Sequence, residues 1–336
     1  MADNRAAILA GAHAAHKLHR DLGVREQLER AGGGRIDVFG AIAKLGATLM
    51  FQPLDKLLGA YVPGEEAGIL ITTQRPLPVQ RFTGAHELGH LYMDHEPSLD
   101  DENILRRAPF SVSGRVERQE READAFASMF LSPAWLIALI IERQGWTRTR
   151  NHLADPVIAY QTSLRLGTSY QATCYALERH RVINRSERDQ LLAVEPREIK
   201  RTLLGGYVPP DWRSDVWLLT DRDEGQLIEG GRRDLFVVRL KENSGAGYLW
   251  DIEQLRHAGF AVLADGREDD ANETIGGVLT RRVTARSDAG VFGEVVLQER
   301  RPWMPQQPLH ELHLHYDLRG PEEPGMWELR RELQAA

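Results

Sequence analysis

The stretch RFTGAHELGHLYMDH, residues 81–95, contains the motif H-E-x-x-H at His86, Glu87 and His90. In a helix, residues four apart lie on the same face, so the two imidazoles point at one spot. A tetrahedral zinc ion takes its first two ligands in this way. Glu87 lies beside that spot, where a carboxylate can take a proton from an attacking water and pass it to a leaving amine. The motif therefore predicts a metallopeptidase.

The flanking sequence decides whether the motif is accidental, because chance produces it in roughly one chain in a hundred of this length. Upstream, Gly68–Thr73 is a short apolar run that predicts a strand beside the motif helix. Such a strand can hold a peptide substrate by strand addition. The motif helix has an apolar surface that includes Phe82, Leu88 and Leu91. A helix buried in this way needs partners for two histidines and a glutamate.

A second helix, Val116–Pro133, is predicted from the helical spacing of its apolar residues. Its acidic side chains supply candidates for a third metal ligand. Glu120 is our choice, while Glu117 and Asp124 lie about one turn away and stay as lesser candidates. For any one of these acids, the alternative is a solvated helix face.

The two helices together resemble the ImmA/IrrE metallopeptidases. That family has a phenylalanine–threonine pair before A-H-E-[LI]-G-H, and a second helix with E-x-x-A-[ND]-x-F-A followed by proline. The chain matches this pattern at Phe82-Thr83, Ala85–His90, Glu120, Ala123, Asp124, Phe126, Ala127 and Pro133. The resemblance covers about the first 135 residues and implies a soluble intracellular endopeptidase with Glu120 as the third zinc ligand. Such enzymes often cleave a helix-turn-helix repressor and so activate phage, mobile-element or stress genes.

Composition agrees with a globular protein of two or three domains, since the chain has 336 residues, 42% hydrophobic and 27% charged. A net charge of −7 argues against nucleic-acid binding by the whole surface. The lone cysteine, Cys174, excludes an intrachain disulfide and is expected to be a buried structural thiol. No apolar run is expected to span a membrane and no signal peptide is visible, so a cytoplasmic protein without a membrane partner is expected.

Residues 1–135 are expected to form an α+β core of the gluzincin-like metallopeptidase type. Residues 136–204 are predicted as a helical extension, in which Asp155–Leu166 and Tyr170–His180 have the spacing of a helix-turn-helix. A DNA-reading helix would begin with basic or amide side chains, whereas this one offers Gln171 and little positive charge. We therefore expect the pair to pack on the core, and we keep DNA binding as the weaker alternative.

Glu195–Gly206 is interpreted as a boundary because paired glycines and prolines follow, and residues 205–214 are predicted as a linker. Beyond it, strands alternate with glycine-rich turns. The predicted strands are 216–220, 235–240, 248–252, 259–263, 280–285, 293–298 and 309–316. This series favours an all-β, immunoglobulin-like sandwich over residues 215–320. Residues 321–336 are expected to form a tail with a short helix at 326–333.

This second half resembles the chagasin family of inhibitors, which bind papain-like cysteine proteases through three loops. The family loop N-P-T-T-G-[YF]-x-W is matched at Asn243, Gly247, Tyr248 and Trp250, although Ser244–Ala246 replace the Pro-Thr-Thr. The other two loops are matched at Gly276, Gly277, Arg301, Pro302 and Trp303. The resemblance implies protein-binding loops at one end of the sandwich, with a protease as a candidate partner. The alternative is that these aromatic residues only pack the sandwich rim.

The sequence as a whole predicts a Zn²⁺-dependent endopeptidase fused to a chagasin-like sandwich that senses a signal or recruits the substrate. His86, His90 and Glu120 would hold the metal, and Glu87 would act as the base. Candidates to stabilise the transition state, or to support the ligands from behind, are Tyr92, His95 and Asp124. Two alternatives stay open, a non-catalytic zinc-containing regulator or protease inhibitor, and a DNA-binding regulator.

Overall fold

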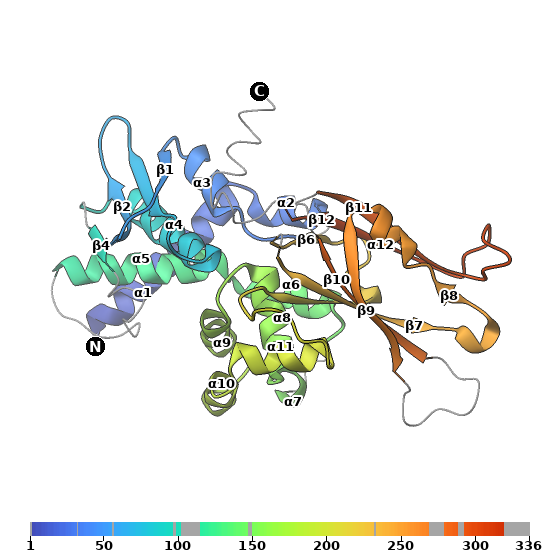
Figure 1. Ribbon diagram of the computed structural model, residues 1–336. Helices are drawn as coiled ribbons and strands as arrows, with labels where there is room; N and C mark the ends of the chain where they lie inside the picture. Colours follow the sequence, from blue (N-terminus) through green and yellow to red (C-terminus); the bar gives the residue numbers. More distant parts are fainter. Residues whose placement is uncertain are drawn as a thin grey trace.

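The computed structural model describes residues 2–31, 33–55, 57–96, 99–101, 115–146, 150–231, 233–268, 279–287 and 292–318. Figure 1 shows a small sheet with α1, α4 and α5 at one end, helices α6–α11 in the middle, and two β-sheets at the other end. The predictions at Gly276, Gly277 and the helix 326–333 lie outside the described residues, as does the side chain of Glu117.

The N-terminal part combines five helices with one four-stranded sheet. Its helices are α1 (Ala2–Asp21), α2 (Val24–Arg30), α3 (Val38–Lys44), α4 (Leu77–Tyr92) and α5 (Arg115–Leu131). Its strands are β1 (Thr48–Gln52), β2 (Leu57–Val62), β3 (Gly68–Thr72) and β4 (Leu99–Asp101). They lie in the order β1-β3-β2-β4, and only the β1–β3 pair is parallel.

Strand β3 is central in this sheet, since β1 and β2 pair with its two sides. The backbone groups of a central strand are already used by its neighbours, so no further strand can be added there. The expectation that Gly68–Thr73 holds a substrate by strand addition is therefore wrong.

Helix α5 lies between α1 and α4, and a glycine allows each close approach. A Cβ atom at Gly11 of α1 would lie 2.1 Å from the Glu122 carbonyl oxygen of α5. A Cβ atom at Gly89 of α4 would lie 3.1 Å from the ring of Phe126. The Phe126 and Phe130 rings stack with centroids 5.5 Å apart and are buried. These contacts bring the two predicted metal-binding helices side by side.

Within the described residues, one stretch, Arg118–Arg143, is long and apolar enough by length and composition to cross a membrane. The expectation that no run reaches this length is therefore wrong. Of its most apolar window, 56% is buried inside the structure, and Pro133 separates α5 from α6. Core helices of soluble proteins pass the same test, and α5 has that packing on α1 and α4.

The middle of the chain is helical. It contains α6 (Ala134–Arg143), α7 (Arg150–Leu153), α8 (Pro156–Leu166), α9 (Tyr170–Arg179), α10 (Arg185–Leu192) and α11 (Pro196–Leu204). The predicted helix pair corresponds to α8 and α9. Thr173, Cys174 and Leu177 of α9 are buried whereas Gln171 is exposed, which agrees with packing on the core. Burial also raises the pKa of the Cys174 thiol to about 11, as expected for a structural cysteine.

Most of the segment Glu195–Gly206, which was interpreted as a boundary, forms helix α11, the last helix of the predicted helical extension 136–204. Ile199, Leu203 and Leu204 of α11 are buried, and Gly205 ends the helix in a left-handed conformation. Only the following stretch up to Asp215 connects helices to strands.

The C-terminal part contains two four-stranded sheets, with orders β5-β7-β10-β9 and β6-β12-β11-β8. Their strands are β5 (Val216–Leu219), β6 (Leu227–Glu229), β7 (Leu235–Glu242), β8 (Leu249–Trp250), β9 (Phe260–Glu268), β10 (Leu279–Ser287), β11 (Phe292–Arg300) and β12 (His310–Asp317). Phe260 of one sheet and Tyr316 of the other meet edge to face, with ring centroids 5.2 Å apart. Strand β6 and helix α12 (Glu253–His257) were not predicted.

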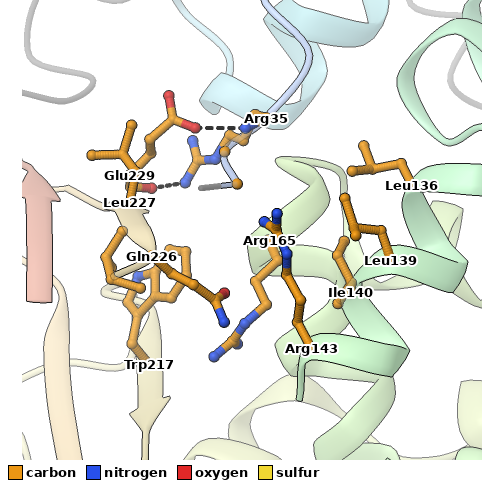
Figure 2. A pocket seen from close by; sticks show the side chains of 13 residues that line it. Arg35, Leu136, Leu139, Ile140, Arg143, Arg165, Trp217, Gln226, Leu227 and Glu229 are labelled. Atoms are coloured by element: carbon orange, nitrogen blue, oxygen red, sulfur yellow. Dashed lines mark hydrogen bonds between the residues drawn. The ribbon is translucent and has the colours of Figure 1, made fainter. Parts of the chain in front are cut away.

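The α+β class is thus confirmed, while the gluzincin and immunoglobulin assignments and the domain boundaries stay predictions. The β-rich part is held against the helices by buried polar groups. The Arg165 guanidinium of α8 donates to Asp223 at 2.7 Å, and Gln144 donates to the same carboxylate at 2.8 Å. Figure 2 shows a second contact of this kind, in which Arg35 donates to Glu229.

Candidate metal centre

Helix α4 buries the polar residues of the motif completely. His86, Glu87 and His90 are each 0% exposed, although all three side chains can carry a charge. A Cβ atom at Gly84 would lie 3.1 Å from Ile71 of β3. The absent side chain lets the sheet approach the helix and exclude water from the site.

Three side chains from two helices converge on one point. His86 Nε2 and His90 Nε2 lie 3.0 Å apart, and Glu120 of α5 places its carboxylate oxygens 3.3 Å and 3.6 Å from them. In a tetrahedral zinc site with bonds of about 2.0–2.1 Å, neighbouring ligand atoms lie about 3.3 Å apart. The measured separations match this value. His86, His90 and Glu120 therefore fit a small divalent cation, and are a group in the described chain that could hold one.

The outer nitrogen of each histidine also has a partner. His86 Nδ1 lies 3.0 Å from Asp124 Oδ1, one turn after Glu120. His90 Nδ1 lies 3.0 Å from His95 Nδ1, and His95 Nε2 lies 3.0 Å from Glu122. Such contacts fix the ring orientation and leave Nε2 free for the metal. Asp124 and His95 thus contact the Nδ1 atoms of the two histidines that are the predicted ligands.

Burial keeps His90 neutral, which is the form that binds a metal. Desolvation is the largest cause lowering its pKa to about 3, and the neighbouring His86 adds to the effect. The pKa of His95 is also lowered, again chiefly by burial. Glu122 was not singled out in the sequence, although it lies only two residues after Glu120. Only tertiary packing shows that it contacts His95.

Glu87, the predicted base, follows the first ligand candidate in the chain and is buried. A Cβ atom at Gly59 of β2 would lie 3.1 Å from Glu87 Oε1. The Glu87 carboxylate therefore faces the sheet at strand β2.

Tyr92 lies away from the centre. Its hydroxyl donates to Asp21 Oδ2 of α1 at 3.1 Å, and its ring lies against Phe126. His95 lies behind His90, on the Nδ1 side. Tyr92 and His95 therefore contact other groups than the Nε2 atoms that face the predicted metal. From these positions they are not placed to stabilise an oxyanion.

Residues 42–178 match the Peptidase_M78 family, described as the IrrE N-terminal-like domain. We call this matched region the IrrE-like domain. The match begins within α3 and reaches α9, so it is longer at its end than the 135 residues of the sequence resemblance. No curated protein matches the chain.

Outside the IrrE-like domain, the structure brings two of the predicted loops together. The Arg301 guanidinium lies over the Tyr248 ring at 4.5 Å and donates from Nε to the Ala246 carbonyl. Gly247, at φ 79°, packs against the Trp303 ring, since a Cβ atom there would lie 2.7 Å from it. The neighbouring Trp303 is 67% exposed. These residues form a single surface, which we call the loop surface.

Trp250 was predicted to belong to the loops, and this is wrong. It is only 7% exposed, and its Nε1 donates to the Lys241 carbonyl at 2.8 Å. Asn243 supports the loop surface from below, because its amide donates to the buried carboxylate of Glu299. The alternative that the aromatic residues pack the rim thus holds for Trp250 and not for Trp303.

Three solved structures are similar to part of the chain. The cysteine protease inhibitor EhICP2 from Entamoeba histolytica shares 17% identity over 32% of this chain and 99% of its own, with a TM-score of 0.27. Amebosin shares 19% identity over 31% and 97%, with a TM-score of 0.24. PbICP-C, in a complex with falcipain-2, shares 14% identity over 33% and 95%, with a TM-score of 0.21.

Proposed function

We propose that this protein is a zinc-dependent endopeptidase that cleaves a specific protein partner. The observation that carries the proposal is the convergence of ligand atoms from His86, His90 and Glu120 within 4.8 Å of one another. Glu87 directly follows His86 in the same buried helix. The match of residues 42–178 to a peptidase family supports it. Buried imidazoles and a carboxylate suit Zn²⁺ as the cation.

A zinc ion held by these three residues supplies Lewis-acid activation of water and of a peptide carbonyl. Glu87 accepts the proton from the attacking water and delivers it to the leaving amine. Asp124 and His95 keep the two ligand rings in the orientation that presents Nε2. The sheet on the other side limits the water that reaches Glu87.

The proposed substrate is a helix-turn-helix repressor in the cytoplasm, cleaved in a stress, phage-related or mobile-element response. This part of the proposal rests on the resemblance of the two metal-binding helices to the ImmA/IrrE enzymes. The β-rich part would act as the sensor or recruiting module, and the exposed Trp303 supplies a surface for protein contact.

Co-expression with the helix-turn-helix regulator encoded by the neighbouring gene tests the proposal. We expect zinc-dependent fragments of the regulator with the wild-type protein, and intact regulator with Glu87→Gln. The variant should retain its zinc, measured by metal analysis, since Glu87 is outside the ligand group. Intact regulator with both proteins would remove the repressor as substrate, and equal cleavage by both would remove Glu87 as the base.

A second candidate function is protease binding through the loop surface, without catalysis. The exposed Trp303, held by Arg301, Tyr248 and Gly247, favours it. Inhibition of papain by the full chain, lost in Trp303→Ala and kept in Glu87→Gln, would support this function. DNA binding through α9 is the weaker alternative, and a gel shift without a retarded band would count against it.

A further inference from the structure

A cavity of about 480 Å³ lies where three parts of the chain meet. Its walls are the start of α4 at residues 76–80, the turn between α8 and α9 at residues 167–170, and the segments 213–215 and 230–234 next to β5 and β7. We call it the junction cavity. Its volume falls in the range of about 300–1,000 Å³ that is usual for small-molecule sites. The smaller cavity of Figure 2, about 30 Å³, has room for little more than one water molecule.

The junction cavity has an excess of positive charge. Four arginines line it, Arg35, Arg75, Arg213 and Arg233, against two carboxylates, Asp215 and Asp234. Both carboxylates are engaged in the wall. Asp215 accepts a hydrogen bond from the Tyr160 hydroxyl at 2.8 Å and lies 3.3 Å from Lys200 Nζ. Asp234 accepts hydrogen bonds from the Trp217 indole and the Gly231 amide. Arg35 is also engaged, because its guanidinium donates to the Glu229 carbonyl. An anion entering the cavity would therefore meet chiefly the exposed guanidinium groups of Arg213 and Arg233.

Two helix N-termini add to the positive potential. Helix α4 has 16 residues and begins after Pro76 with no side-chain cap, and α9 has 10 residues and begins at Tyr170. Each N-terminus carries a partial positive charge.

One side chain that lines the cavity, Gln80, is buried and uses only one of its two polar atoms in a hydrogen bond. Gln80 is 1% exposed, and its Nε2 donates to the Arg75 carbonyl at 2.7 Å. Its Oε1 accepts no hydrogen bond from any residue that the structure describes.

We propose that the junction cavity binds a small organic anion, with its phosphate or carboxylate group towards the arginines. No part of this binding depends on the proposed peptidase activity. The consequence for activity, however, rests on the proposed function. Gln80 and His86 lie on the same helix, about 9 Å apart along its axis. Arg81 ties this helix to the Gly167 and Ile36 carbonyls at 3.1 and 2.7 Å, so the cavity wall and the metal centre share one rigid element.

Titration calorimetry of the full chain with citrate and with inorganic phosphate tests the binding and separates the two anion classes. We expect at least one probe to bind, with an affinity at least about tenfold weaker in the double variant Arg213→Ala/Arg233→Ala. Both arginines are exposed, so the variant should fold. Arg185→Ala, an exposed arginine of α10 outside the cavity, is the control and should bind as the wild type does. Binding of neither probe, or equal binding by the double variant, would overturn the proposal.

Hydrogen exchange tests the coupling to α4. The probe that binds should slow exchange of the backbone amides of Leu77–Tyr92 in the wild type and in Glu87→Gln alike. Unchanged exchange with a bound probe would overturn the coupling. Glu87→Gln is expected to lack peptidase activity but leaves the junction cavity unchanged. Calorimetry and hydrogen exchange therefore test the cavity even if the protein proves not to be a peptidase.

Discussion

The two ends of the molecule bury carboxylates with different partners. At the N-terminal end, Glu120 and Glu122 are buried beside histidines. Burial lowers the pKa values of His19 and His90 at this end to about 4 and about 3. The β-rich end buries carboxylates that face arginines and amides. Glu242 accepts hydrogen bonds from Arg281 and Arg267.

The difference indicates what each end is built for. Neutral imidazoles that turn their Nε2 atoms to a common point could bind one metal ion there. The carboxylates of Glu242 and Glu299 instead accept hydrogen bonds from Arg281, Trp250 and Asn243, which are parts of the chain itself. The first arrangement suits a ligand from outside the chain, and the second holds the chain's own residues in place.

Replacing Glu242 gives the largest effect expected from this contrast. Glu242→Ala leaves Arg281 without one carboxylate partner and the Trp250 amide without its acceptor. Breaking a buried pair on one side costs about 3–5 kcal/mol of unfolding free energy. Urea unfolding measures the loss. Glu253→Ala, which removes an exposed pair with Arg256, is the control and should cost about 1 kcal/mol or less. A loss as small for Glu242 would mean that its contacts contribute little.

The pH dependence of stability sharpens the same contrast at the histidine-rich end. His19 of α1 is buried against Phe130, its Nε2 lying 2.9 Å from the Phe130 carbonyl. Desolvation is the main cause that lowers its pKa from 6.5 to about 4. The unfolded chain therefore takes up the proton first as pH falls. The contribution of the neutral His19 to the free energy of unfolding is fully present above pH 6.5. It is lost as pH falls from 6.5 to about 4, and it amounts to roughly 3 kcal/mol.

His19→Gln keeps an amide donor for Phe130 and removes the titration. Urea unfolding at several pH values should show a shallower loss of stability between pH 6.5 and 4 in this variant than in the wild type. His16→Gln, on the exposed side of the same helix, serves as the matched control. Parallel curves for wild type and His19→Gln would show that this histidine is not buried in solution.

Local periodicity was enough to predict the parts that lie within one helix. The i, i+4 spacing of His86 and His90 set two ligands, and the apolar pattern of α5 placed Glu120. What depends on tertiary contact could not be predicted. Nothing in the spacing shows that His95 reaches Glu122, or that β3 has neighbours on both sides.

The C-terminal half shows the same limit. Seven strands could be predicted from alternation and turns, whereas β6 has three residues and α12 five, too short for a periodic signal. Trp250 and Trp303 belong to similar loop motifs, but only the fold decides that one is buried and one exposed. Helix α11 lies inside the predicted helical extension, but its bounds were not predicted, because the glycines and prolines that follow it dominated the pattern.

Replacing Asp124 tests whether the histidine-rich end is organised around a metal. Asp124→Asn weakens the contact with His86 Nδ1, which orients the ring. Removal of such a partner lowers metal affinity about 10–100-fold, or about 1.4–2.7 kcal/mol. Competition with a zinc-binding dye measures the affinity, and Asp189→Asn on the exposed side of α10 is the control. Equal affinity in both variants would contradict the assigned role of Asp124.

The smallest effect is expected at the loop surface, where two tryptophans provide a matched pair. Trp303 is 67% exposed, so Trp303→Ala should change the free energy of unfolding by only about 0.5 kcal/mol. Trp250 is 7% exposed and hydrogen-bonded, so Trp250→Ala should cost about 3–5 kcal/mol. Denaturant unfolding of the two variants compares them directly. If both substitutions lower the free energy of unfolding by several kcal/mol, Trp303 is a packing residue, and its exposure no longer supports a binding site at the loop surface. If Trp303→Ala is silent in stability yet abolishes recruitment of the substrate or binding of a protease, the exposed ring is kept for contact with a partner.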